Sequence, residues 1–203
     1  MQKLIPIFPL SLVVFPQSRY PLYIFEPRYK LLIEKCLAEN TGFGIISLTK
    51  SEVSKIGCYV DVPKLVKKFP SGEMDIIVTG KYRFVRDGLK THSDGYHIAK
   101  IKKYTDISEK PDLKLLVKLR NTFTNILKNI NLELDKSFWS NYEISTQKSF
   151  KLAEKSGLSI EQQLELLSIR EENRRIQFLL DHFNKFEKDL EVKGIVLGDG
   201  YIN

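Results

Sequence analysis

The sequence predicts an α+β protein in which a small barrel-like sheet with one inserted helix is followed by a bundle of helices. Two observations support this prediction. Short apolar runs, several with period-two alternation, crowd the first half of the chain, and apolar stripes at helical spacing fill the part after Pro111. Several short strands at close spacing, separated by turn residues, are typical of a small barrel.

The strand segments expected in the first half are short and bounded by proline or glycine. They cover residues 4–8, 12–15, 43–48, 58–69, 73–80, 82–87 and 96–104. The turn signal Pro70-Ser71-Gly72 joins two of them, so we expect a hairpin between 58–69 and 73–80. Gly88 and the run 93–95 bound a second, looser hairpin. Pro9 and Pro16 lack an amide hydrogen, which confines them to strand edges or bulges.

One helix is expected to interrupt these strands. Pro27 suits the first position of a helix, and the negative charge of Glu26 favours the positive end of the helix dipole. The apolar residues that follow have the spacing of one helix face: Tyr29, Leu32, Ile33, Cys36 and Leu37.

Helix signals dominate after residue 111. Asp112 can cap a helix whose apolar stripe runs from Leu116 to Ile130, and a further helix is expected around residues 150–153, ended by Gly157. Two capping boxes follow, Ser159 with Gln162 and Ser168 with Glu171, and each predicts a helix start. We therefore expect a β-barrel subdomain over residues 1–107, a helical subdomain over 112–190 and an apolar tail over 191–203.

Composition and charge restrict the class of protein. The net charge is +7, but the lysines are scattered rather than clustered, which favours a solvated surface over a dedicated nucleic-acid site. No apolar stretch reaches the length of a membrane span, and prolines interrupt the apolar start of the chain. Two cysteines, Cys36 and Cys58, are too few for a disulfide framework and fit a reducing compartment. The expectation is a cytoplasmic protein with no membrane partner.

Motifs that carry chemistry are missing from the sequence. Phosphate-binding glycine loops, HExxH, CxxC and GxSxG do not occur, and His92 and His97 have no cysteine or carboxylate cluster beside them, so neither a cofactor nor a metal is expected. Cys36 falls on the apolar helix stripe, where a thiol is buried and inert. The charged run 170–175 is expected to form a solvated helix face in which Glu171 meets Arg174 and Arg175.

The first segment of the chain resembles the N-terminal domain of Lon proteases, the Lon substrate-binding family. The matching elements are Phe8-Pro9-Leu10, Val14-Phe15-Pro16, Pro21-Leu22, Ile24-Phe25-Glu26 and Arg28-Tyr29, followed later by Gly57-Cys58 and the run from Val78 to Phe84. The resemblance extends from about residue 2 to 190, more loosely in the helical part. The span Thr49–Ile56 is shorter here than in many Lon proteins.

This resemblance implies a PUA-like pseudo-barrel followed by helices. In full-length Lon the region helps to recognise unfolded or tagged proteins, and an AAA+ ATPase and a Ser-Lys protease domain follow it. This chain ends at Asn203, before either domain, so the resemblance implies a non-catalytic module, an adaptor or a regulator of proteolysis. Its partners would be unfolded or tagged polypeptides, a Lon protease or another protein. Its oligomeric state is left open.

Two binding functions follow. A polypeptide site needs an exposed aromatic groove with a polar rim, for which the candidates are Arg19, Tyr20, Tyr23, Arg28 and Phe69. Phe8, Val13, Phe15, Leu22 and Phe25 are expected in the core. The alternative is RNA binding, known for PUA-like barrels, for which the candidates are Lys64, Lys67, Lys68, Phe69 and Lys81.

Overall fold

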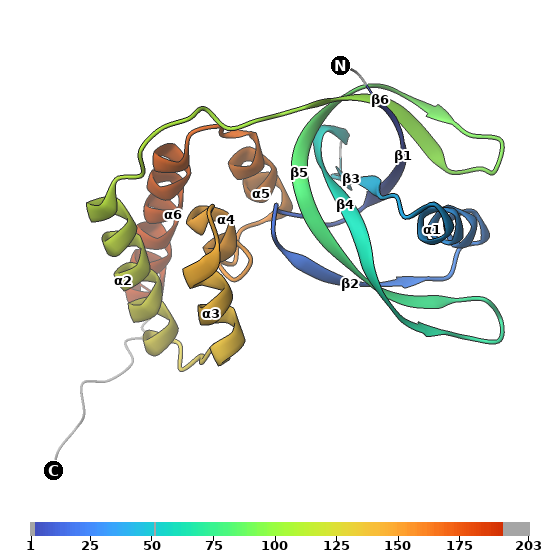
Figure 1. Ribbon diagram of the computed structural model, residues 1–203. Coiled ribbons are helices and arrows are strands. Elements are labelled where there is room, and N and C mark those ends of the chain that lie inside the picture. Colours follow the sequence, from blue (N-terminus) through green and yellow to red (C-terminus); the bar gives the residue numbers. More distant parts are fainter. Residues whose placement is uncertain (1–2, 51, 193–203) are drawn as a thin grey trace, which may run out of the picture. The chain divides into compact units, whose positions relative to one another are not determined.

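The structure, a computed structural model, describes residues 3–50 and 52–192 (Figure 1). Its strands are β1 (Lys3–Leu10), β2 (Arg19–Ile24), β3 (Phe43–Leu48), β4 (Val53–Lys68), β5 (Met74–Thr91) and β6 (His97–Lys103). Its helices are α1 (Pro27–Glu39), α2 (Leu113–Asn129), α3 (Lys136–Ile144), α4 (Lys148–Ala153), α5 (Ile160–Ser168) and α6 (Glu172–Val192). The α+β class and the single helix inserted among the strands are as predicted.

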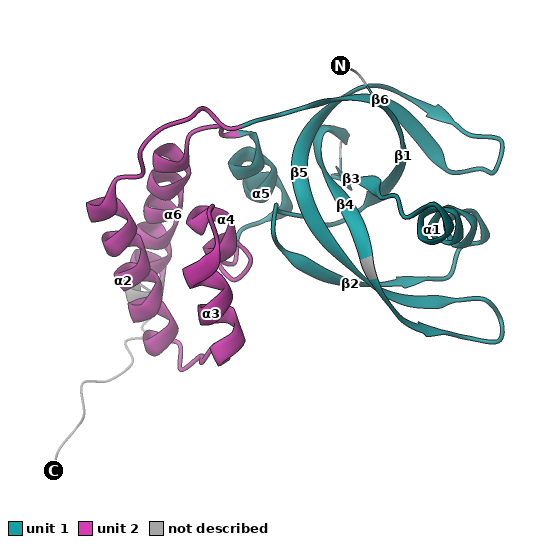
Figure 2. Ribbon diagram, viewed as in Figure 1, with its two compact units in different colours: residues 1–105, 158–168 teal, residues 106–157, 169–203 magenta. Residues whose placement is uncertain are grey.

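The chain divides into two compact units (Figure 2). Unit 1 holds Met1–Thr105 together with Leu158–Ser168, and unit 2 holds Asp106–Gly157 and the chain from Ile169 onward. The units differ from the expected subdomains in α5, which belongs with the strands. The reason lies in polar contacts, because Arg83 of β5 donates to the buried carbonyl of Leu167 and the Tyr104 hydroxyl donates to Ser168 O at 2.9 Å. Residues 193–203, most of the expected apolar tail, lie outside the described residues.

Unit 1 is a sheet that closes on itself through β5. The strand order is β2-β5-β4-β3-β1-β6, and β6 pairs again with β5. The first half of β5 pairs with β2 over Met74–Thr79, while its second half pairs with β6 over Phe84–Thr91. All pairings are antiparallel except that of β1 with β3. The length of β5 therefore lets one strand serve three neighbours.

The prolines of β1 occupy positions where the strand has a neighbour on one side only. β1 pairs with β6 over Lys3–Ile7 and with β3 over Ile7–Leu10. Pro6 lies opposite Ile98 in the first stretch and Pro9 lies opposite Ile46 in the second. Because neither proline needs an amide hydrogen on its open side, the strand tolerates both, as expected for Pro9.

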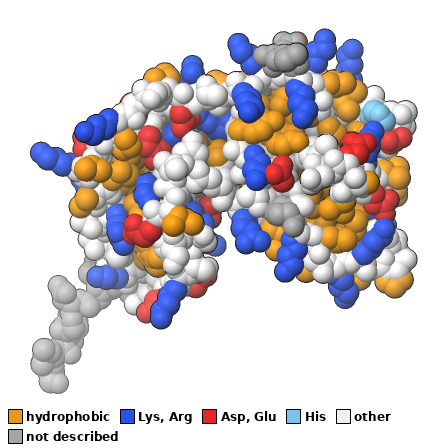
Figure 3. Space-filling model, viewed as in Figure 1, with side chains coloured by type: hydrophobic (Ala, Val, Ile, Leu, Met, Phe, Trp, Pro, Cys, Tyr) orange, Lys and Arg blue, Asp and Glu red, His pale blue; other side chains and the backbone are white. Residues whose placement is uncertain are grey.

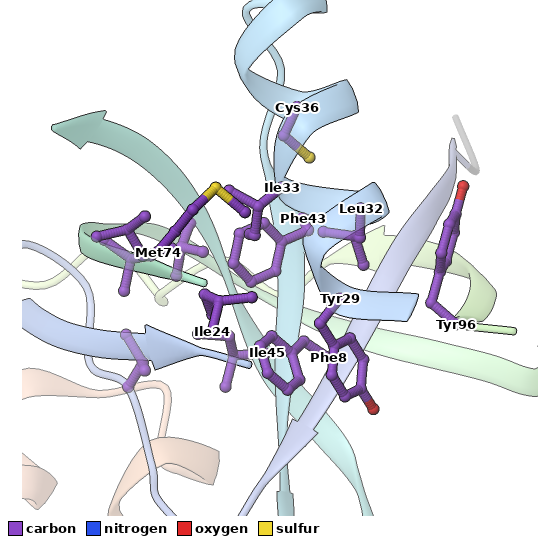
Figure 4. Close-up of a cluster of buried hydrophobic side chains, with 14 of the residues drawn as sticks. Phe8, Ile24, Tyr29, Leu32, Ile33, Cys36, Phe43, Ile45, Met74 and Tyr96 are labelled. Atoms are coloured by element: carbon purple, nitrogen blue, oxygen red, sulfur yellow. The ribbon is translucent and has the colours of Figure 1, made fainter. Parts of the chain in front are cut away.

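Helix α1 covers the core of unit 1 with the apolar face predicted from its spacing. Tyr29, Leu32, Ile33 and Cys36 are buried, and the Tyr29 ring stacks on Phe8 at 3.8 Å between centroids (Figure 4). Pro27 stands at the start of the helix as predicted, and Asn40 in the left-handed conformation (φ 51°) ends it.

Three expectations about the strands were wrong in detail. Residues 12–15 form no strand, although Val13, Val14 and Phe15 are buried. The loop passes so close to β5 that a Cβ on Gly80 would lie 2.2 Å from Phe15 O. The strand β2 was not expected, and the segments 73–80 and 82–87 form one continuous strand. The predicted hairpin between 58–69 and 73–80 is confirmed by the pairing of β4 with β5.

The Phe84 ring of β5 is fully buried in one of the two apolar clusters of unit 1, beside Ile5, Ile7 and Ile46. Two glycines on neighbouring strands make room for it. A Cβ on Gly44 would lie 2.7 Å from the ring and one on Gly57 would lie 2.8 Å from it. Side chains at these two positions would displace the ring, so the glycines permit β3 and β4 to close around β5.

Unit 2 consists of helices held by a buried ionic cluster around Arg175. Its guanidinium is fully buried and lies 2.8 Å from Asp106 Oδ2 and 2.6 Å from Glu172 Oε2. It also lies over the Phe150 ring at 4.4 Å and donates to Ile169 O at 2.9 Å. The expected solvent face over 170–175 was therefore wrong for Arg175 and Glu172, whereas the half-buried Glu171 does pair with the exposed Arg174 at 3.6 Å.

Of the two capping boxes predicted in the second half, one is confirmed and one was wrong. Ser159 and Gln162 exchange the two hydrogen bonds of a capping box, at 2.9 and 3.3 Å. Ser168 instead ends α5, where its hydroxyl donates to Glu165 O at 2.7 Å. Asp112 caps α2 by accepting from Lys114 and Leu115, and Gly157 is left-handed (φ 70°), both as predicted.

The glycine constraint predicts the effect of adding a methyl group at residue 44. We expect Gly44→Ala to destabilise unit 1 by about 1–3 kcal/mol, because the Cβ meets the Phe84 and Ile7 side chains below contact distance. The cost should fall when Phe84→Leu is present, since the smaller side chain leaves space. A double-mutant cycle measured by urea unfolding checks this. Additive effects would contradict it.

The ionic cluster predicts a strong effect of removing its cation. Arg175→Met leaves two carboxylates without their guanidinium and should destabilise unit 2 by about 3–5 kcal/mol. Urea unfolding followed by the fluorescence of Trp139, the only tryptophan of the sequence, measures this. Arg174→Met is the matched control, because that guanidinium is 72% exposed, and its effect should stay below about 0.5 kcal/mol. Equal losses would contradict the role given to Arg175.

Candidate binding surface

Three aromatic side chains from separate segments of unit 1 meet on its surface. Tyr23 is the penultimate residue of β2, Phe25 precedes α1, and Phe69 follows β4. The Tyr23 ring centroid lies 6.0 Å from that of Phe25 and 6.1 Å from that of Phe69, the latter edge to face. Tyr23 is 56% exposed and Phe25 58% exposed. We call these three residues the aromatic patch.

Strand alternation explains why Tyr23 and Phe25 point outward. Ile24, between them, is buried in the core with Leu22 packed against the same cluster. Successive side chains of an extended chain face opposite sides, so the neighbours of a buried residue are exposed. Across the sheet, Tyr23 lies opposite Asp75 of β5, and Asp75 lies opposite Lys67 of β4. The Lys67 ammonium lies 4.3 Å from the Phe69 ring centroid and places a cation at the edge of the patch.

The hairpin that carries Phe69 is tied to α1 by polar contacts. Lys30 lies 3.6 Å from Glu73 and donates to Ser71 O at 3.0 Å, and Lys68 lies 2.7 Å from Glu34. A hydrogen bond from the Ser71 hydroxyl, together with Lys30, holds the pKa of Glu73 below its usual value, so this carboxylate stays ionised at neutral pH. The turn itself is closed by Phe69 N donating to Glu73 O at 2.9 Å. The patch therefore rests on fixed elements.

The other three residues expected at a polypeptide site differ in their position relative to this patch. Arg19 is exposed on the same face of β2 as Tyr23, at the far end of the strand. Tyr20 lies on the opposite face, half-buried against the core. Arg28 is half-buried, pairs with Glu26 at 2.7 Å and lies over the Tyr29 ring at 4.7 Å. Of the five candidates, the structure brings Tyr23 and Phe69 into contact.

Phe25 was expected in the core and is instead the most exposed member of the patch. The sequence held a usable signal, because Tyr23, Ile24 and Phe25 continue an alternation that puts Ile24 inside. The alternation continues from β2, a strand that the sequence analysis does not predict.

The lysines proposed for RNA binding are partly neutralised. Lys68 pairs with Glu34 at 2.7 Å and Lys81 pairs with Asp61 at 3.0 Å. Lys64 and Lys67 lie on β4 and are exposed. Because each ion pair reduces the positive potential available to phosphates, this face is a weaker site for a nucleic acid than the lysine count alone indicates.

In the space-filling view, hydrophobic side chains gather where α1, β2 and the hairpin lie, bordered by Lys and Arg (Figure 3).

Neither cysteine has the environment of a nucleophile. Burial raises the pKa of the Cys36 thiol to about 11 and that of Cys58 to about 12. Both thiols are therefore protonated at neutral pH. Within the residues that the structure describes, no group of three or more His, Cys, Asp and Glu side chains is arranged to hold a metal ion. Among these same residues, no helix is long and apolar enough to cross a membrane.

A strand-rich ring joined to helices is a fold that is found among solved structures. The Lon N-terminal domain protein of Xanthomonas campestris superposes with a TM-score of 0.69 at 23% identity, covering 88% of this chain and 98% of that one. The N-terminal domain of the Mycobacterium avium complex Lon protease superposes with a TM-score of 0.70 at 12% identity, covering 90% and 98%. These likenesses confirm the fold.

The family follows from the sequence itself. Residues 4–185 match the model of the ATP-dependent protease La (LON) substrate-binding domain. The match spans most of the 203 residues, so the chain belongs to the Lon substrate-binding domain family, as the resemblance of its first segment implied.

The raised thiol pKa values predict slow alkylation of the native chain. At about pH 8 both thiols are almost fully protonated, so iodoacetamide should react far more slowly with native protein than with unfolded protein. As the pH is raised, Cys36 should react before Cys58, since its pKa is the lower of the two. Mass spectrometry of Cys36→Ala and Cys58→Ala separates the sites. Rapid alkylation of native protein at neutral pH would contradict the assignment.

Proposed function

We propose that this protein is a non-catalytic module that binds unfolded or tagged polypeptides through the aromatic patch and acts as an adaptor or regulator of proteolysis in the cytoplasm. The observation that carries the proposal is the contact of the exposed Tyr23 ring with the rings of Phe25 and Phe69. Membership of the Lon substrate-binding family supports the choice of a polypeptide as the ligand.

Contact between the three rings matters more than their exposure alone. Single exposed apolar residues are common on soluble proteins, whereas contiguous apolar surface bordered by polar groups marks an interaction site. Aromatic rings bind diverse apolar side chains with little loss of conformational entropy. Such a surface suits clients that share apolar composition rather than one sequence.

Charged groups at the border of the patch add selectivity for the kind of polypeptide segment that binds. Lys67 supplies positive charge at the edge of the patch, and Asp75 lies between Tyr23 and Lys67. Arg19 adds positive charge on the same face at the far end of β2. Charged border groups mainly steer association and set its salt dependence. Arg28 is already paired with Glu26, so its role is to hold the start of α1 beside Phe25.

The patch predicts the outcome of polar substitution. The triple variant Tyr23→Ser, Phe25→Ser and Phe69→Ser should bind fluorescein-labelled, reduced and carboxymethylated α-lactalbumin at least about ten-fold more weakly, because the rings are the contacts. Fluorescence anisotropy measures the affinity. Val117→Ser in α2 is the matched control, since this side chain is 60% exposed in unit 2 and should not affect binding.

Two results would count against the proposal. One is the lack of saturable binding by the wild-type chain up to about 100 μM, which corresponds to roughly 5.5 kcal/mol. The other is tighter binding to a mixed RNA pool than to the unfolded protein, with affinity falling steeply between about 50 and 200 mM salt. That result would favour the RNA-binding alternative.

A further inference from the structure

A second surface of unit 1 has the features of a binding pocket. Its volume is about 290 Å³, and it lies between the first residues of β1, the end of α1, the residues before β3 and the β5–β6 loop. None of the three aromatic patch residues lines it. The volume is at the lower end of the range of about 300–1,000 Å³ for small-molecule sites. It therefore suits a single large side chain.

The pocket arises because two paired strands diverge. β1 pairs with β6 from Lys3 onward, but its parallel ladder with β3 begins only at Ile7 and Gly44. The four residues before Ile7 therefore have a neighbouring strand on one side only. The pocket opens on the other side, between Lys3–Pro6 and the residues Thr41 and Gly42. An open strand edge is a template for an extended chain.

The base of the pocket is aromatic and fixed in place. Tyr59 is 8% exposed and Tyr96 is 2% exposed. The Tyr59 hydroxyl accepts from the Gly42 amide at 2.8 Å, and its ring stacks on Tyr82 at 4.9 Å. The Tyr96 ring stacks on His92 at 4.6 Å. Leu32 and Cys36 of α1 complete the base (Figure 4).

The rim of the pocket carries unbalanced positive charge. Lys3 lies with its ammonium 5.6 Å from the Tyr59 ring centroid, and Lys35 projects from α1. Neither lysine forms an ion pair with any residue of the described ranges 3–50 and 52–192. Glu39 is the acidic residue of the lining, and His92 is engaged by Asp94 at 3.3 Å. Two available ammonium groups over an apolar base complement a carboxylate joined to an apolar side chain.

We propose that this pocket binds the C-terminal residue of a polypeptide. Its apolar side chain enters between Tyr59 and Tyr96, its α-carboxylate lies between Lys3 and Lys35, and the preceding residues extend along the open edge of β1. The proposal rests on the proposed function, since it takes a polypeptide as the ligand. It adds a second site, which recognises a free C-terminus. An α-carboxylate near two ammonium groups forms hydrogen bonds in which donor and acceptor carry opposite charges, whereas a carboxamide accepts from the same groups without a negative charge of its own.

The test compares two short flexible Gly-Ser peptides that carry fluorescein at the N-terminus and end in Phe, one as the free acid and one as the amide. Anisotropy with the wild-type chain should show the acid binding at least about ten-fold more tightly than the amide. In the variant Lys3→Gln with Lys35→Gln, the affinities for acid and amide should become equal. The matched control Lys64→Gln with Lys102→Gln changes the same charge at exposed positions outside the pocket and should keep the preference.

The outcomes separate this proposal from the proposed function. If the Tyr23, Phe25 and Phe69 triple variant loses unfolded-protein binding but keeps the preference for the acid peptide, two sites exist as inferred. If it loses both, the chain end binds at the aromatic patch, and the pocket proposal is wrong while the proposed function stands. Equal binding of acid and amide by the wild-type chain, or a preference that survives the Lys3 and Lys35 changes, also overturns the pocket proposal.

Discussion

The closure of β3 and β4 around β5 in unit 1 depends on the packing of the Phe84 ring against the backbones of Gly44 and Gly57. Phe84 is fully buried, and its ring occupies the space where Cβ atoms would otherwise stand on β3 and β4. Because interiors are packed to the density of organic crystals, a larger side chain at either glycine does not fit without rearrangement, and a smaller one at residue 84 leaves a cavity. The contact fixes β5 between β4 and β6, and β5 in turn sets the position of β2 and of the hairpin.

Both proposed binding surfaces lie at the ends of strands whose positions this arrangement fixes. The aromatic patch forms where β2 ends beside the β4–β5 hairpin, and the pocket forms where β1 and β3 diverge before their ladder begins. Each uses side chains whose backbones are held by the barrel, so little ordering is needed when a ligand binds. Preorganised contacts of this kind retain more of their interaction energy as affinity.

Local sequence signals predicted most of the fold but not its long-range polar contacts. Helix α1 was predictable because Pro27 and its apolar spacing act within the helix itself. The burial of Arg175 was not predictable, because the neighbouring sequence is the same whether this side chain is exposed or buried. Its partner Asp106 lies 69 residues away. Phe25 was misplaced for a similar reason, since its exposure depends on β2 pairing with β5. Ser168 satisfied a capping pattern, yet its hydroxyl bonds back to the preceding helix.

The central claim is that a polypeptide binds where the three aromatic rings meet on unit 1. The most direct measurement is a titration of ¹⁵N-labelled protein with unlabelled, reduced and carboxymethylated α-lactalbumin, followed by amide chemical shifts. The account predicts that shifts concentrate in residues 22–26 and 66–73, with little change in α2 and α6. Shifts confined to unit 2, or spread evenly over both units, would contradict it.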